Sequence, residues 1–97
     1  MIMKKKYRYV LTMLSSNEQP NETELLKKIK EFMGVMRFAY ANPSIIKSFQ
    51  ENKFVIKCIR GYESDIINAL SFIKQLNGKR TGIYTIKTSG TLKSLRA

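Results

Sequence analysis

The amino-acid sequence predicts an α+β fold of order βαββαβ, in which two main helices cover one face of a four-stranded antiparallel sheet. Three observations predict it. The chain has 97 residues, the length of one domain, so we expect residues 1–97 to fold as a single unit. Four strand-length runs are rich in β-branched and aromatic residues. After the first and third runs, longer stretches carry apolar residues at helical spacing.

The first strand and the first helix have clear boundaries. Residues 7–14 form an apolar and aromatic run between several lysines and a Ser-Ser-Asn turn, which predicts a strand. Asn21 is a suitable helix N-cap, Glu24 stands three positions later as in a capping box, and Gly34 is a natural helix end. The expected buried face of this helix consists of Leu25, Leu26, Ile29, Phe32 and Met33.

Residues 35–42 are ambiguous. The larger apolar residues here are Met36, Phe38 and Tyr40, and they alternate as in a strand. No partner strand is obvious. We expect a loop or a short irregular piece here, and Pro43 limits any helix before it.

The second and third strands are predicted as a hairpin. Residues 44–50 and 53–60 are both strand-length apolar runs. The two residues between them, Glu51-Asn52, suit a tight turn.

The second helix and the last strand complete the order. After Gly61 the apolar residues again fall on one helical stripe, and Asn77-Gly78 is expected to close that helix. Residues 81–88 are predicted as the last strand. The stripe consists of Ile66, Ile67, Leu70, Ile73 and Leu76.

This order of elements is typical of the ferredoxin-like or RNA-recognition-motif sandwich. In its usual spatial order, 4-1-3-2, the start of the first strand lies beside the ends of the third and fourth strands. Basic residues that are distant in the sequence would then converge at one end of the sheet. They occur at residues 4–8, at Lys57 and Arg60, and at residues 87–96.

The charge distribution supports a polyanionic partner. Lys and Arg number 18 against 7 Asp and Glu, which gives a net charge of +11 and a pI near 10.0. All seven acids lie within residues 18–65, so both ends of the chain are basic and the middle is close to neutral. Such a protein attracts nucleic acid and other polyanions.

Several classes of site are excluded by composition. Without histidine and with one cysteine, Cys58, the chain has no internal disulfide, no plausible zinc or haem site and no catalytic Ser-His or Cys-His pair. Cys58 is interpreted as a small apolar residue of a core strand. No stretch approaches the roughly 20 apolar residues of a membrane span, and no secretory leader is evident. We therefore expect a soluble cytoplasmic protein, or a nuclear or nucleolar one in a eukaryote.

Two features leave alternatives open. Tyr7 and Tyr9 share one face of the first strand and either stack on bases or pack within the protein. The third strand lacks the aromatic signature of RNA-recognition motifs, which disfavours sequence-specific reading by the sheet face. Glu63 and Asp65, in the first turn of the second helix, favour a structural role there over a phosphate site.

Both faces of the predicted sheet are partly apolar. Val55 and Ile59 oppose Phe54 and Ile56 on the third strand. Two explanations are open. Either a partner protein or a second copy of the chain covers the second face, or these residues are scattered exposed apolar side chains.

The stretch VIKCIRGYESDIINALSFI, residues 55–73, resembles the Ile-Leu-Arg-Cys-x-Arg, Asp and Ala-Leu-x-Leu-Ile pattern of a family of small ribonuclease P proteins. This family is called component 2 in archaea and the Pop-five type in eukaryotes. The tail SGTLK, residues 89–93, is similar to its Val-Ser-Gly-Thr-Ile-Arg/Lys element. The resemblance extends from Arg8 to Lys93. Residues 86–88 depart from the family's usual Leu-Gly-Val, and Phe54 replaces a frequent glycine.

The resemblance implies a noncatalytic subunit of ribonuclease P, which removes the 5′ leader from precursor tRNA. Catalysis would belong to the RNA and to the Mg²⁺ ions that it holds, and the protein would bind no cofactor. The implied partners are the catalytic domain of the ribonuclease P RNA, a TIM-barrel-like protein subunit and a second copy of the chain, in a two-plus-two assembly.

The candidate RNA-binding residues combine the basic segments with the Ser-Gly-Thr element. That element is expected to end the last strand in a turn that glycine permits. The N–H and hydroxyl groups of the turn either bond RNA oxygens or form a simple polar turn. No catalytic or metal-binding residue is assigned. The candidates are Lys4, Lys5, Lys6, Arg8, Lys57, Arg60, Lys87, Ser89, Gly90, Thr91, Lys93 and Arg96.

Other function classes remain. A freestanding structured-RNA or ribosome-associated protein would bind RNA without a protein companion. A protein-protein adaptor would use the apolar sheet face and carry its charge only for solubility. An enzyme of ferredoxin-like fold is disfavoured because the usual catalytic residue types are missing.

Overall fold

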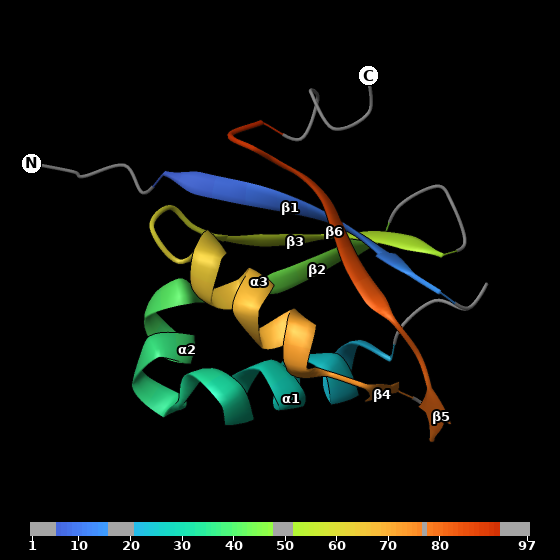
Figure 1. The fold of residues 1–97 in the computed structure, drawn as a ribbon. Helices are drawn as coiled ribbons and strands as arrows, with labels where there is room; N and C mark the ends of the chain where they lie inside the picture. The colour runs from blue at the N-terminus through green and yellow to red at the C-terminus, as the bar shows by residue number, and fades with distance from the viewer. Residues whose placement is uncertain (1–5, 16–20, 48–51, 77, 92–97) are drawn as a thin grey trace, which may run out of the picture.

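The computed structural model describes residues 6–15, 21–47, 52–76 and 78–91. In these ranges an antiparallel sheet of order β2-β3-β1-β6 carries three helices on one face (Figure 1), and β4 and β5 form a separate two-stranded sheet. The predicted sandwich and its strand order are confirmed. The elements are β1 (Tyr7–Leu14), α1 (Glu22–Met33), α2 (Val35–Ala41), β2 (Ser44–Lys47), β3 (Lys53–Ile59), α3 (Glu63–Phe72), β4 (Gln75–Leu76), β5 (Lys79–Arg80) and β6 (Ile83–Ser89).

The core lies between the sheet and the helices. Alternate residues of a strand point to opposite faces, and Val10 of β1 pairs with Ile56 of β3 on the face that the helices cover. Cys58 is completely buried on the same face, as its interpretation as a core residue requires. The buried cluster comprises Val10, Leu14, Leu25, Ile29, Phe54, Ile56, Cys58, Ile66, Ala69, Leu70, Ile73 and Leu76.

The ends of α1 agree with the sequence prediction. The Asn21 side chain accepts a hydrogen bond from the Glu24 backbone N–H at 3.1 Å. Gly34 ends the helix with φ at +90°, a value that L side chains rarely adopt, and its N–H donates to the Lys30 carbonyl. Leu25 and Ile29 are fully buried, whereas Phe32, which we placed on the buried face, is 46% exposed.

Residues 35–41 form the helix α2, so the prediction of a loop or irregular piece is wrong. Gly34 breaks the chain direction and lets a new helix begin. Asn42 ends that helix in the left-handed conformation, with its N–H bonded to the Phe38 carbonyl. The sequence signal was misleading because Ala41 is buried and Phe38 is partly buried against the core, while Met36 and Tyr40 are exposed.

The second predicted helix ends earlier than expected, since α3 stops at Phe72 rather than at Asn77-Gly78. Ile73 and Leu76 are nevertheless buried, because the extended chain beyond the helix carries them into the same core. Strands β4 and β5 flank the Asn-Gly sequence, which is a strong hairpin signal. The Thr81 N–H bonds the Lys74 carbonyl at 2.9 Å and continues this pairing.

The other boundaries differ by a few residues. Strand β2 is described to Lys47, and residues 48–51 of the predicted strand and turn lie outside the described residues. Strand β6 runs from Ile83 to Ser89, later at both ends than predicted.

A bulge in β6 sets which of its side chains share a face with β1. Leu11 pairs with Lys87, but the next residue, Thr12, pairs with Thr85, so Ile86 is the extra residue. The register beyond the bulge places Lys87 and Ser89 on the sheet face opposite the helices, where Ser89 faces Tyr9. We call this face the open face.

The open face is partly apolar, as predicted. Val55 is 5% exposed, and Leu11, Met13 and Ile59 are half-buried. None of the helices in the described ranges is long and apolar enough to cross a membrane.

Candidate nucleic-acid interface

Three strand ends lie together at one end of the sheet. The Arg60 backbone N–H donates to the Lys6 carbonyl at 2.8 Å, which fixes the end of β3 against the start of β1. The pairing of Tyr9 with Ser89 brings the end of β6 to the same place. An open hollow of about 320 Å³ lies there, and we call its lining the basic pole: Lys6, Tyr7, Arg8, Arg60 and Gly90.

In the part of the chain that the structure describes, cations of the first two predicted basic segments line the hollow, whereas Lys57 and Lys87 lie on the open face outside its lining. Lys6, Arg8 and Arg60 come from two strands that are distant in sequence but line one hollow. Gly90, beyond β6, completes it. Lys4, Lys5, Lys93 and Arg96, the other cations predicted for this surface, lie outside the described residues.

Lys57 contacts the basic pole through Tyr7. Its ammonium nitrogen lies 4.1 Å from the centroid of the Tyr7 ring, a cation–π contact. One side of the ring is therefore occupied by a protein cation, although the side chain is 37% exposed. Of the two alternatives for Tyr7, this contact supports packing within the protein.

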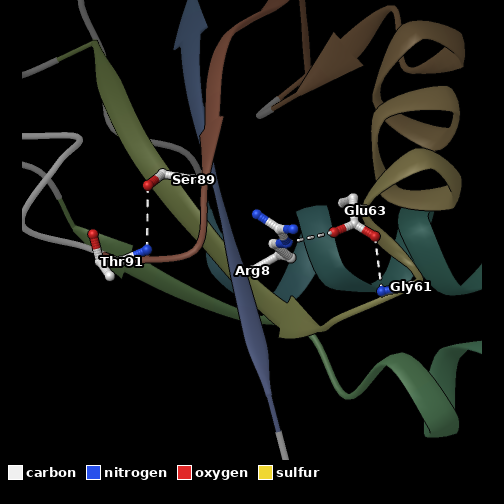
Figure 2. A network of polar contacts seen from close by, with 5 residues as sticks. All are labelled: Arg8, Gly61, Glu63, Ser89 and Thr91. Carbon is white, nitrogen blue, oxygen red and sulfur yellow. Dashed lines mark hydrogen bonds and ion pairs between the residues drawn. The ribbon is translucent and has the colours of Figure 1, made fainter.

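Arg8 is held by an acid of α3. Its Nε lies 3.3 Å from Glu63 Oε2, and the other carboxylate oxygen accepts the Gly61 backbone N–H at 2.8 Å. Figure 2 shows the Glu63 carboxylate between Arg8 and Gly61. Arg8 Nε is buried without a well-aligned hydrogen bond, so the contact with Glu63 is an ion pair. This pairing reduces the net positive charge of the basic pole.

Asp65 also has a protein partner, Arg37 of α2, at 3.2 Å. Both first-turn acids of α3 therefore form ion pairs within the protein, as their structural interpretation predicts. The charges of these two acids are therefore compensated within the protein, and their carboxylates occupy the start of α3.

The Ser-Gly-Thr element forms a local turn at the end of β6. The Thr91 N–H donates to Ser89 Oγ at 3.2 Å (Figure 2), which supports the polar-turn alternative for these two groups. Gly90 has no positive φ, unlike Gly34, Gly61 and Gly78. The expectation that this turn needs glycine for its backbone conformation is therefore wrong.

Lys87 extends the basic surface along β6. It is exposed and pairs with Leu11 in the register, two positions before Ser89. Because alternate residues share a face, Lys87 and Ser89 lie in line on the open face, leading toward the basic pole.

Cys58 has no chemical role at this surface. Burial raises the pKa of its thiol to about 11, and the negative charge of Glu63 adds to the shift. The thiol is therefore protonated at neutral pH, and a thiolate is the form that acts as a nucleophile.

The sequence analysis missed a set of exposed apolar side chains on the helices α1, α2 and α3. The Phe32 and Phe72 rings stack with centroids 4.9 Å apart, and Phe72 is 68% exposed. Exposed apolar residues of α2 follow Phe32 closely in the chain. We call the set the helix-side cluster: Phe32, Val35, Met36, Tyr40 and Phe72. The sequence did contain a signal for this set, because the apolar run at residues 35–41 is longer than a loop needs.

Comparison with known proteins gives consistent matches. A family model described as the Rpp14/Pop5 family matches residues 6–97. "Ribonuclease P protein component 2" of Pyrococcus furiosus is 28% identical, over 97% of this chain and 82% of that protein. The same-named protein of Pyrococcus abyssi is 30% identical, over 97% and 84%. That of Methanocorpusculum labreanum is 29% identical, over 92% of this chain but 63% of its own length.

A solved structure has the same fold. One chain in the cryo-EM structure of yeast ribonuclease MRP superposes with a TM-score of 0.67, covering 95% of this chain and 79% of that one. The sequence identity is 10%, so this likeness bears on the fold alone.

Proposed function

The chain belongs to the Rpp14/Pop5 family, and from that premise we propose that it is a noncatalytic, RNA-binding subunit of ribonuclease P. It supports the catalytic domain of the ribonuclease P RNA while that RNA removes the 5′ leader from precursor tRNA. The observation that carries the proposal is the convergence of Lys6, Arg8 and Arg60 on one open hollow.

The basic pole suits the backbone of folded RNA. Arg side chains offer forked N–H donors that match phosphate oxygens, and Lys adds a mobile point charge. The RNA backbone follows the cations from the hollow along β6 to Lys87. Lys4, Lys5, Lys93 and Arg96 neighbour these segments in the sequence and add positive charge to them. Phosphate contacts of this kind supply affinity and orientation without reading sequence.

Cleavage belongs to the RNA in this proposal. The chain contains no histidine, and its one thiol is protonated within the core. The Mg²⁺ ions that activate water and stabilise the leaving group are held by RNA phosphates. The protein contributes charge neutralisation, which lowers the Mg²⁺ concentration that the RNA needs to fold.

Two protein contacts complete the proposal. In a two-plus-two assembly, each small subunit binds one larger, TIM-barrel-like subunit and a second copy of itself, so it needs two protein-binding surfaces. Among the described residues, large apolar side chains are exposed in the helix-side cluster, on β6 at Tyr84 and Ile86, and at Tyr7 of the basic pole. Contiguous exposed apolar residues mark protein-binding surfaces.

Reconstituted cleavage of precursor tRNA tests this function. The ribonuclease P RNA and the larger protein subunit are assayed at limiting Mg²⁺, with and without this chain. We expect the chain to raise the cleavage rate at least tenfold and to shift the Mg²⁺ requirement downward. An unchanged rate, together with recovery of ribosomal RNA when the chain is purified from cells, would instead identify a ribosome-associated protein.

A further inference from the structure

Gly90 stands beside the guanidinium of Arg8, and its backbone conformation does not explain why a glycine is there. Its φ is not positive, so this position does not need the left-handed conformation that favours glycine. A Cβ at this position would lie 3.5 Å from Arg8 Nη1, an ordinary contact without a clash. A side chain larger than alanine would extend further beside that nitrogen. The glycine therefore leaves space next to Arg8 free.

The two ends of the Arg8 guanidinium face different surroundings. Nε is turned to Glu63, 3.3 Å away, and is buried. Nη1 lies on the side of Gly90, at the hollow that Lys6 and Arg60 also line. Figure 2 shows Arg8 with Glu63 on one side and the Ser89–Thr91 turn on the other. The ion pair thus fixes one edge of the guanidinium and leaves its other end directed at the hollow.

The hollow has the charge of a site for an anionic group and is large enough to admit one. Three cationic side chains line it and Glu63 compensates one of them, so an excess of positive charge remains. A volume of about 320 Å³ corresponds to roughly ten water molecules, at about 30 Å³ for each water in the liquid. That is room for a phosphate group with part of its hydration shell.

We propose that the hollow is a discrete site for a single RNA phosphate, bound by Lys6, Arg60 and the Nη1 end of Arg8, with Gly90 as the residue that keeps its entrance open. This inference rests on the proposed function and adds to it one defined contact among the diffuse cationic ones. The phosphate belongs either to an internal linkage or to a 5′ end, since both present the same oxygens to the site.

Substitution of Gly90 separates this site from general electrostatics, because it removes no charge. The assay measures binding of the ribonuclease P RNA to the full chain as the salt concentration rises, for wild type, Gly90→Ala and Gly90→Val. One lost phosphate contact lowers the slope of log K against log[salt] by roughly 0.7 to 0.9. We expect Gly90→Val to lose that amount and to bind at least fivefold more weakly, with a smaller effect for Gly90→Ala.

An Arg8→Met background provides the matched control. If the valine acts by blocking Arg8, Gly90→Val has no further effect on the slope in that background. A Gly90→Val protein that is folded by circular dichroism and keeps the wild-type slope would overturn the discrete site. In that case the double variant Lys6→Ala, Arg60→Ala is compared with the wild type. A smaller slope for the variant retains the proposed function. RNA binding by the wild type that does not depend on salt defeats both the discrete site and the proposed function.

The source of the phosphate is distinguished by the RNA. Transcripts with a 5′-hydroxyl and a 5′-monophosphate are compared with the same three proteins. Equal effects of Gly90→Val on both transcripts assign an internal linkage. An effect confined to the phosphorylated transcript assigns the 5′ end.

Discussion

Arg60 donates its backbone N–H to the carbonyl oxygen of Lys6, at 2.8 Å, across the junction of β3 and β1. These residues stand far apart in the sequence, and only the antiparallel pairing of their strands brings them together. The same pairing, continued to β6, adds Gly90 to the hollow that they line. The basic pole is therefore produced by topology, and its cations should separate when the sheet unfolds.

The N-cap of α1 offers a first test of local structure. Asn21→Ala removes the acceptor of the Glu24 N–H and should lower the free energy of unfolding by about 1 kcal/mol. Asn21→Asp keeps an acceptor and should restore most of this loss. Urea unfolding followed by circular dichroism measures both variants. Equal stability of Asn21→Ala and wild type would mean that the side chain does not cap the helix in solution.

Phe54 tests the core. It is completely buried between the sheet and the helices, so Phe54→Ala should lower the free energy of unfolding by about 3–5 kcal/mol. Phe72→Ala is the matched control, because the Phe72 side chain is 68% exposed and should cost less than about 1 kcal/mol. The comparison is made by urea unfolding under one set of conditions. Similar losses for both variants would contradict the assignment of Phe72 to the surface.

The helix-side cluster should matter for assembly rather than for folding. Truncation of a central apolar contact residue typically costs about 2 kcal/mol of binding energy. Phe72→Ser combined with Met36→Ser should therefore weaken either self-association or binding of the larger protein subunit at least tenfold. Analytical ultracentrifugation and calorimetry measure the two interactions. Unchanged values in both would show that this cluster is not a protein-binding surface.

The raised pKa of the Cys58 thiol predicts how the free energy of unfolding depends on pH. Burial raises the pKa of the folded thiol from 9.0 to about 11, so the unfolded chain loses its proton first. The stability that this group contributes is fully present below about pH 9 and is lost as the pH rises toward 11. Between about pH 8 and pH 10 the wild type should lose more stability than Cys58→Ala, because that variant lacks this titration. Parallel losses would mean that the thiol is solvated in the folded protein.

The sequence predicted those parts of the fold that depend on local signals. The Asn21 cap and the Gly34 helix end are encoded within a few residues, and the strand order follows from the sequence of elements. Helix α2 was missed because its larger apolar residues, Met36, Phe38 and Tyr40, alternate as in a strand, although Met36 and Tyr40 are exposed in the structure. The early end of α3 was missed because Leu76 keeps helical spacing while it reaches the core in an extended strand.

The candidate site was predictable only as a collection of cations. The direction of each strand was enough to place Lys6, Arg8 and Arg60 at one end of the sheet. The Arg8–Glu63 ion pair was not predictable, because it depends on how closely α3 packs against β1. The space beside Gly90 also depends on side-chain positions in two strands that are distant in sequence.

The salt dependence of RNA binding tests the basic pole most directly. Lys6→Ala with Arg60→Ala removes two cations of the pole. Lys27→Ala with Lys74→Ala removes two exposed cations, one from α1 and one from the segment between α3 and β4, and neither of them lines the hollow. Both double variants have the same net charge. We predict that the slope of log K against log[salt] falls by roughly 0.7 to 0.9 for the first variant, which loses the phosphate contact at the hollow, and by much less for the second. Equal slopes for the two variants would contradict a localised RNA-binding surface.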